Sequence, residues 1–251
     1  MLDYYYTQSI LMINLNLRYF YCLSCLSIIM IGSSCKSIHV IDQIPEDTYQ
    51  VSVNQYLKLD PKSGQLTGQK AVKADVEQTD SLLKISPQLT QLKPFDIKLD
   101  QVDQIKMHRN TLDIDVLTVP FKIRPSVKGF PQQLDANFDA ALYIGRRRDN
   151  YTIEKPTSKR ALKPRITGAG YGYGGFIGIG SVTMNPYVTQ QTINYEYSGF
   201  VLNGGIAGIY DAKKFNIGLA LGADILMDKN RSNWIYQGKP WIGVLFGINL
   251  N

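Results

Sequence analysis

The second half of the chain alternates bulky apolar residues with small or polar ones, and this pattern restricts the fold more than any other feature of the sequence. In residues 215–225, FNIGLALGADI, one side carries Phe, Ile, Leu and Ala, and the other carries Asn, Gly, Ala and Asp. Residues 136–145 and 241–251 repeat the alternation. Successive side chains of a strand point to opposite faces of a sheet, so the pattern predicts strands with two different faces.

Six segments of this kind follow one another with no helical period between them, which predicts an all-β architecture. They cover residues 112–124, 135–146, 165–183, 196–210, 214–226 and 239–250. The bulky side is almost wholly apolar, whereas the other side is too small and too polar to form a packed core. We therefore predict a small antiparallel, transmembrane-type β-barrel of about eight strands, with lipid outside and a narrow polar interior.

A glycine-rich stretch at residues 168–180, GAGYGYGGFIGIG, contains a literal G-x-G-x-x-G at Gly170, Gly172 and Gly175. A dinucleotide-binding loop must follow a strand, open a helix and precede an acidic ribose ligand by about twenty residues. No helical period follows these glycines, and the acid at a suitable offset, Glu196, lies in strand-like sequence. The stretch therefore predicts the crowded inner face of a strand, and we expect no cofactor.

The N-terminal region has the charge and length of a secretory signal, and its end resembles a bacterial lipobox. Arg18 precedes an apolar stretch from Tyr19 to Ile31, which is too short to span a bilayer, and the segment IGSSC ends at Cys35. We expect removal of residues 1–34 and acylation of Cys35. The alternative is an ordinary signal that leaves Cys35 as a free thiol. The residues before Met12 are unusual ahead of such a signal, and translation can also begin at Met12.

The mature chain is expected to contain two regions. Residues 35–110 are polar and weakly patterned, and they indicate a linker with one or two strands or a small periplasmic subdomain. Residues 111–251 are expected to form the barrel.

The net charge of +6 is concentrated in residues 146–165, which carry eight basic residues against Asp149 and Glu154. A basic segment beside a membrane can contact anionic headgroups, lipopolysaccharide phosphates, peptidoglycan or an acidic envelope protein. The candidate contact residues are Arg146, Arg147, Arg148, Lys159 and Arg160. A solvated loop without a specific ligand is the alternative, and nucleic acid is not expected as a partner of an exported protein.

The sequence offers little for catalysis. His39 and His108, its two histidines, have no neighbour at metal-ligand spacing, and no G-x-S-x-G elbow is present. Asp139 and Asp224 should point into the barrel, where charged residues usually pair with basic ones or line water. We expect neither a metal site nor an enzyme.

The C-terminal half resembles small uncharacterised outer-membrane β-barrel proteins of the Bacteroidota. The resemblance rests on the segments VLTVPFKIRPS, GGIAGIYDAKKFNIGLALGADILMDKN and WIYQGKPWIGVLFGINLN. The likeness covers residues 112–251 and implies a fold and a location but no activity. The chain departs from the barrel pattern at its end, where Leu250 and Asn251 replace the usual terminal aromatic residue.

Together these features predict a lipid-anchored barrel of the bacterial outer membrane with a structural, adhesive or accessory role. The alternative is a soluble β-sandwich lipoprotein, tethered by its N-terminal lipid, that binds a ligand or a partner. The outward side of sandwich strands is normally polar, which the bulky apolar side seen here does not match. The lengths of the connections between strands indicate that the basic segment lies on the periplasmic side.

Overall fold

The computed structural model describes residues 39–63, 66, 68–79, 82–101, 103–127, 129–155, 164–211 and 216–247. Within these residues nearly all regular structure is antiparallel strand, which confirms the predicted all-β class. The predicted signal peptide, Cys35, Lys159 and Arg160 lie outside the described residues.

Twelve strands are present in the described part of the chain, joined in one sheet, with a single α-helix and two 3₁₀ turns. The N-terminal elements are β1 (His39–Ile41), β2 (Asp47–Ser52), α2 (Val53–Leu59), η1 (Pro61–Ser63), β3 (Ala71–Gln78), β4 (Leu82–Pro87) and β5 (Phe95–Lys98). The later elements are β6 (Gln104–Arg124), β7 (Gln133–Asp135), β8 (Asp139–Glu154), β9 (Arg165–Met184), β10 (Tyr197–Asp211), β11 (Asn216–Leu226), η2 (Lys229–Ser232) and β12 (Pro240–Gly247).

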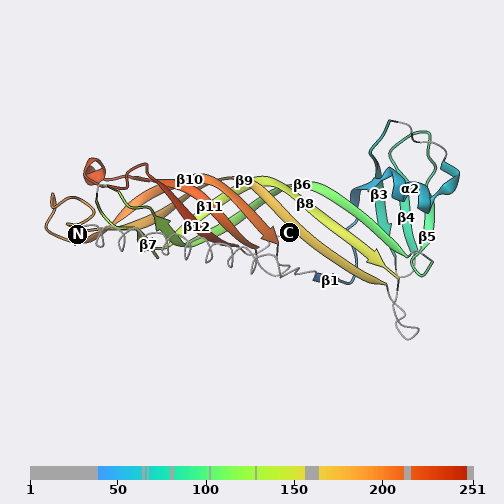
Figure 1. Ribbon diagram of the computed structural model, residues 1–251, viewed down its shortest axis with the longest axis horizontal. Helices are drawn as coiled ribbons and strands as arrows, with labels where there is room; N and C mark the ends of the chain where they lie inside the picture. The colour runs from blue at the N-terminus through green and yellow to red at the C-terminus, as the bar shows by residue number, and fades with distance from the viewer. Residues whose placement is uncertain are drawn as a thin grey trace, which may run out of the picture. The chain divides into compact units, whose positions relative to one another are not determined.

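Six of these strands pair in a closed circuit, which we call the ring. β6 pairs with β8, β8 with β9, β9 with β10, β10 with β11 and β11 with β12. β12 then pairs with β6, for example Ile242 with Ile123, so the circuit returns to its first strand. Figure 1 shows these strands running side by side. A closed circuit leaves no unpaired edge along the paired lengths.

The six strands predicted from alternation all occur, and the ring within the described residues contains six strands rather than about eight. Most boundaries agree within a few residues, but β6 begins at Gln104 and β8 continues to Glu154, well beyond the predicted ends. β6 also runs unbroken through residue 110, where the sequence suggested a domain boundary. The alternation weakens in these extensions because their surroundings differ from those of the ring, as described below.

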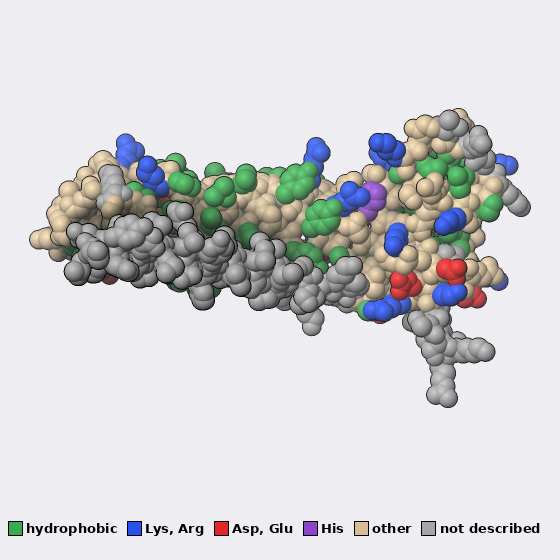
Figure 2. Space-filling view, in the orientation of Figure 1, with side chains coloured by type: hydrophobic (Ala, Val, Ile, Leu, Met, Phe, Trp, Pro, Cys, Tyr) green, Lys and Arg blue, Asp and Glu red, His purple; other side chains and the backbone are tan. Residues whose placement is uncertain are grey.

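The outer face of the ring is covered by large apolar side chains, each between 38% and 68% exposed. We call this surface the apolar band. It consists of Leu112, Ile114, Val116, Phe121, Ile123, Leu142, Ile144, Tyr171, Tyr173, Ile177, Ile179, Phe200, Ile206, Ile217, Leu219, Leu221, Ile225, Ile242 and Phe246. In Figure 2 hydrophobic side chains lie along this part of the molecule.

The interior of the ring combines charged, amide and aromatic side chains. The buried polar residues are Asp113, Asp115, Lys122, Arg124, Asp139, Asp149, Asn203, Asn216 and Asp224, all at most 3% exposed. An apolar cluster that includes Tyr143, Phe176 and Trp241 lies among them. The prediction that Asp139 and Asp224 point inward therefore agrees with their burial, and Tyr143, which the alternation places on the same side as Asp139, is buried as well.

Glycine on the inner wall makes room for these side chains. A Cβ atom at Gly222 would lie 2.5 Å from the ring of Trp241, and a Cβ at Gly180 would collide with the carboxylate of Asp139. A ring of few strands has a small radius, so its inner face cannot hold a large residue at every position. The stretch at residues 168–180 thus forms part of strand β9, with Gly170 and Gly172 buried and Tyr171 and Tyr173 exposed.

The described residues between 42 and 101 fold as a subdomain with an ordinary apolar core. β2, β3, β4 and β5 pair in sequence, and β2 joins β6 through Gln50 and His108. Their core also takes Ile105 from β6, Tyr151 from β8 and Ile166 from β9. Figure 1 shows β6, β8 and β9 extending past the other ring strands toward this subdomain. The linker alternative for this segment is therefore not observed.

At the opposite end of the ring, two connections form a separate apolar cluster. Residues 185–196 and 227–239 contribute Val188, Ile193, Trp234, Ile235 and Tyr236, which are all nearly buried. Val182, Met184, Val201 and Leu226 of the adjoining strand ends complete the cluster. The connections at this end therefore contact one another and the inner ends of the ring strands.

Candidate functional site

The two faces of β6 exchange their character within the strand. On the outer face Lys106, His108 and Asn110 are followed by the exposed residues Leu112 and Ile114. On the inner face the buried apolar residues Ile105 and Met107 are followed by the buried residues Asp113 and Asp115. Between residues 110 and 112, therefore, the outward-facing side chains of β6 change from polar to apolar, and its environment changes with them.

Six outward-facing residues gather at this transition, and we call them the rim patch. Strand register places Asn110, Arg148 and Tyr171 in one row, and Leu112, Arg146 and Tyr173 in the next row toward the apolar band. Together with Thr111 and Arg147, they line a recess of about 540 Å³. Because β6, β8 and β9 are hydrogen-bonded neighbours here, their backbone fixes the spacing of these six side chains.

The two arginines of the rim patch have no acidic partner among the residues that the structure describes. Arg146 is exposed, and neither Arg146 nor Arg148 forms an ion pair with a described carboxylate. The Nε atom of Arg148 is shielded from solvent and has no hydrogen-bond partner within the described residues. The patch therefore offers two uncompensated guanidinium groups beside two tyrosine rings.

Arg147 lies on the opposite face of β8, so the predicted group of three neighbouring arginines is divided. Its Nε atom lies 2.7 Å from Asp149, and its Nη2 atom contacts Asp211. Arg109 joins the same group, with Nε 3.0 Å from Asp149 and Nη1 2.9 Å from Asp47 of the subdomain. We call these five residues the junction cluster, and its carboxylates compensate the charge of Arg147.

A second charged group, the lumen network, lies deeper in the ring. Lys122 Nζ is 2.8 Å from Asp139 and 3.1 Å from Asp224. Arg124 contacts Asp224 and Asp135, and Trp241 Nε1 donates a hydrogen bond of 2.7 Å to Asp224. Asn203 donates to Asp139 at 2.8 Å. The lumen network matches the predicted role of Asp139 and Asp224 as inward charges that pair with basic residues.

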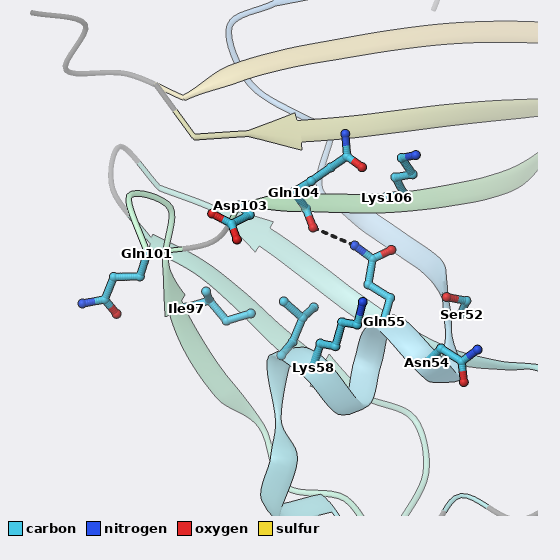
Figure 3. A pocket seen from close by; sticks show the side chains of 10 residues that line it. Ser52, Asn54, Gln55, Lys58, Ile97, Gln101, Asp103, Gln104 and Lys106 are labelled. Atoms are coloured by element: carbon cyan, nitrogen blue, oxygen red, sulfur yellow. Dashed lines mark hydrogen bonds between the residues drawn. The ribbon is translucent and has the colours of Figure 1, made fainter. Parts of the chain in front are cut away.

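The subdomain carries a polar pocket of about 660 Å³, drawn in Figure 3. Gln55 of α2 donates a hydrogen bond of 2.9 Å to the carbonyl of Gln104, and Lys58 of α2 and Lys106 of β6 also line the pocket. Asp103 also lines the pocket, and its hydrogen bond with Lys155 lowers the pKa of its carboxyl group. These amide and ammonium groups can bind a polar ligand by hydrogen bonds, but the ten lining residues include no histidine or cysteine.

Of the predicted site residues, Arg146 and Arg148 lie together in the rim patch, Arg147 lies in the junction cluster, and Cys35, Lys159 and Arg160 are outside the described residues. Tyr171 and Tyr173 were not among the residues predicted for this site. The alternation predicted that both residues lie on the outer face of β9. Their proximity to Arg146 and Arg148 could not be predicted, because it depends on the register between β8 and β9.

No protein family, curated protein or solved structure matches this chain. No helix in the described ranges is long and apolar enough to cross a membrane. Across the same residues, no cluster of three or more His, Cys, Asp or Glu side chains is placed to hold a metal ion.

Proposed function

We propose that this chain is an outer-membrane β-barrel protein, lipid-anchored at Cys35, with a structural, adhesive or accessory role in the envelope. The observation that carries the proposal is the exchange of faces along β6, where the exposed residues become apolar as the inner residues become charged. A strand surrounded by water on its outer side gains nothing from exposing a continuous row of large apolar residues. A strand that enters lipid requires such a row.

The dimensions of the apolar band support the same proposal. On β9 the band extends from Tyr171 to Ile179, and on β11 it extends from Ile217 to Ile225. A tilted transmembrane strand needs about 9–11 residues to cross the hydrocarbon core. The closed pairing of the ring also fits a membrane better than a sandwich, because lipid cannot satisfy the backbone groups of an open sheet edge.

The filled interior supports a role other than diffusion of solutes. Lys122, Asp139 and Asp224 are paired and almost completely buried, and Tyr143 and Trp241 are fully buried beside them. Barrels of eight strands already have interiors filled by side chains, and a ring of six is narrower. We therefore favour a scaffold that displays the subdomain on one side of the membrane and the long connections on the other.

The connections suggest which end faces the periplasm. The β9–β10 and β11–β12 connections, residues 185–196 and 227–239, lie at one end of the ring. At the subdomain end, β10 ends at Asp211 and β11 begins at Asn216, so only four residues separate these two strands in the sequence. Outer-membrane barrels have long outer loops and short periplasmic turns. On this basis the subdomain faces the periplasm. An acyl group on Cys35 in the inner leaflet lies on the same side.

The test is to express the chain in a Gram-negative host with residues 1–35 replaced by a signal that leaves no lipid. The barrel proposal predicts that the protein stays in the membrane pellet after carbonate extraction and migrates differently on gels with and without heating. Release into the soluble fraction would contradict it and favour the sandwich lipoprotein. In parallel, fatty-acid labelling of the natural chain and of Cys35→Ser tests the anchor alone, with labelling expected only for the natural chain.

A further inference from the structure

We propose that the rim patch binds the phosphate of an anionic glycerophospholipid in the membrane leaflet nearest the subdomain. This inference rests on the proposed function, because it requires the apolar band to lie in lipid. The patch sits where the outer face of β6 changes from Asn110 to Leu112, which is the level at which lipid headgroups meet acyl chains.

The chemistry of the patch matches a phosphate diester better than other groups found at that level. Arg146 and Arg148 present guanidinium groups, which bind phosphate oxygens through two parallel N–H bonds. Neither arginine is neutralised by a described carboxylate, whereas Arg147, between them in the sequence, has two acidic partners. Among the described residues, acidic neighbours therefore compensate the charge of Arg147 and not the charges of Arg146 and Arg148.

The remaining members of the patch suit the other parts of a lipid. Tyr171 and Tyr173 are 48% and 65% exposed, and amphipathic rings at this level are typical of membrane interfaces. Leu112 and Ile144 continue the outer face toward the centre of the band and can contact the first carbons of an acyl chain. Asn110 offers an amide to the headgroup on the side away from the hydrocarbon.

Several observations favour a lipid of the inner leaflet over lipopolysaccharide, which occupies the outer one. The patch is on the parts of β6, β8 and β9 that lead into the subdomain, and β10 ends and β11 begins at that end with only four residues between them in the sequence. The recess of about 540 Å³ is also small compared with a multi-chain glycolipid. The expected ligand is therefore a phospholipid such as phosphatidylglycerol.

The experiment uses the full chain purified in neutral detergent and measures bound lipid by native mass spectrometry. Phosphatidylglycerol and phosphatidylcholine with identical acyl chains are titrated separately, and we expect the anionic lipid to bind on the order of thirtyfold more tightly at low salt. Arg146→Gln combined with Arg148→Gln should abolish this preference, and each single variant should reduce it about fivefold. High salt should weaken the preference in the natural chain.

The matched control is Lys106→Gln combined with Arg165→Gln, which removes two positive charges from the same outer face beyond the rim patch. It should keep the preference. Equal loss in this control, absence of a preference in the natural chain, or a higher affinity for lipid A than for phosphatidylglycerol would overturn the inference. Displacement of the lipid by equimolar inorganic phosphate would show a free-phosphate site instead.

The same samples separate this inference from the proposed function. If the natural chain migrates differently after heating and stays in the membrane but shows no lipid preference, only the lipid site fails. If it is extracted as a soluble protein, the barrel proposal fails as well. Should the double variant not fold, as judged by heat-dependent migration, the single variants and the salt dependence of the natural chain decide the question.

Discussion

At the level of single residues, the buried charges of the lumen network depend on one another. Lys122 Nζ lies within 3.1 Å of two carboxylates, from Asp139 and Asp224, and 4.7 Å from the centre of the Trp241 ring. Removing one member of a buried ion group leaves an uncompensated charge, which is more costly than the loss of a surface contact. The lumen network therefore makes the ring sensitive to substitutions that would be harmless on its exterior.

We expect Lys122→Met to lower the free energy of unfolding by about 3–5 kcal/mol, because Asp139 and Asp224 lose their shared cation. Urea unfolding in lipid or detergent, followed by tryptophan fluorescence, measures the change. Lys106→Met, on the exposed outer face of β6, is the control and should change stability by less than about 0.5 kcal/mol. Equal stability of Lys122→Met and the natural chain would contradict the network.

Glycine positions on the two faces of the ring should respond differently to the same substitution. A Cβ atom at Gly222 would lie 2.5 Å from Trp241, whereas a Cβ at Gly208 has no heavy atom within 4 Å. We expect Gly222→Leu to prevent assembly, because the interior cannot accommodate the added volume. Gly208→Leu should assemble normally, since its side chain joins the apolar band. The yield of heat-modifiable protein in the membrane fraction compares the two variants.

At the level of elements, β9 shows how much of the fold the sequence predicts. The alternation correctly placed Tyr171, Tyr173, Ile177 and Ile179 on one face, because a strand with two contrasting environments reveals its period directly. The six strands of the ring followed from the same signal. The number of strands in a closed circuit did not, because it depends on pairing between segments distant in sequence.

The subdomain strands and the rim patch were harder to predict for a related reason. β2–β5 are short, and their polar outer faces resemble loop sequence. β6 and β8 each pass through two environments, so the outward side is polar near Lys106 and apolar near Val116. A search for strands that keep their apolar residues on one face throughout therefore misses the ends of β6 and β8. The exchange of polar and apolar residues between the two faces of one strand indicates a change of environment. This interpretation requires neighbouring strands to show the exchange at the same height along the ring, which the sequence alone does not give.

Under the proposed function, a charge placed within the apolar band should hinder insertion into a bilayer, whereas the same charge beyond the rim patch should not. Ile177→Arg lies on the outer face of β9 and is expected to cost about 2–4 kcal/mol. Ala169→Arg lies on the same face of the same strand, on the subdomain side of Tyr171, and should have little effect. The fraction of protein folded into phospholipid vesicles from urea, measured by heat-dependent migration, provides the comparison. Equal folding of both variants would argue against lipid around the band.

At the level of the whole molecule, the ring separates two exposed regions. The subdomain is joined to it through β6, β8, β9 and the junction cluster, whereas the connections at residues 185–196 and 227–239 lie at the other end. Under the proposed function, these regions face opposite sides of the outer membrane. The protein would thus present two distinct surfaces that cannot contact the same partner.

Cysteine labelling in intact cells tests this arrangement. Tyr187→Cys, at a position 67% exposed in the outer connection, should react with a membrane-impermeant maleimide in intact cells. Lys84→Cys, in β4 of the subdomain, should react only after the outer membrane is permeabilised, because its exposed side chain then faces the periplasm. The reverse labelling pattern would invert the orientation, and labelling of both positions in intact cells would argue against a membrane-spanning ring.

The pairing of β12 with β6 has a consequence for how the molecule can form. This is the contact that closes the circuit, and it joins Leu117 to Gly247 across most of the described chain. Its register shifts between Val244 and Phe246, opposite the segment of β6 that contains Pro120, which lacks a backbone donor. Until the last strand arrives, the other five form an open sheet with two reactive edges. Under the proposed function, we expect this closure to be a late event of folding, and a chaperone or assembly factor would have its greatest effect by shielding those edges until β12 pairs with β6.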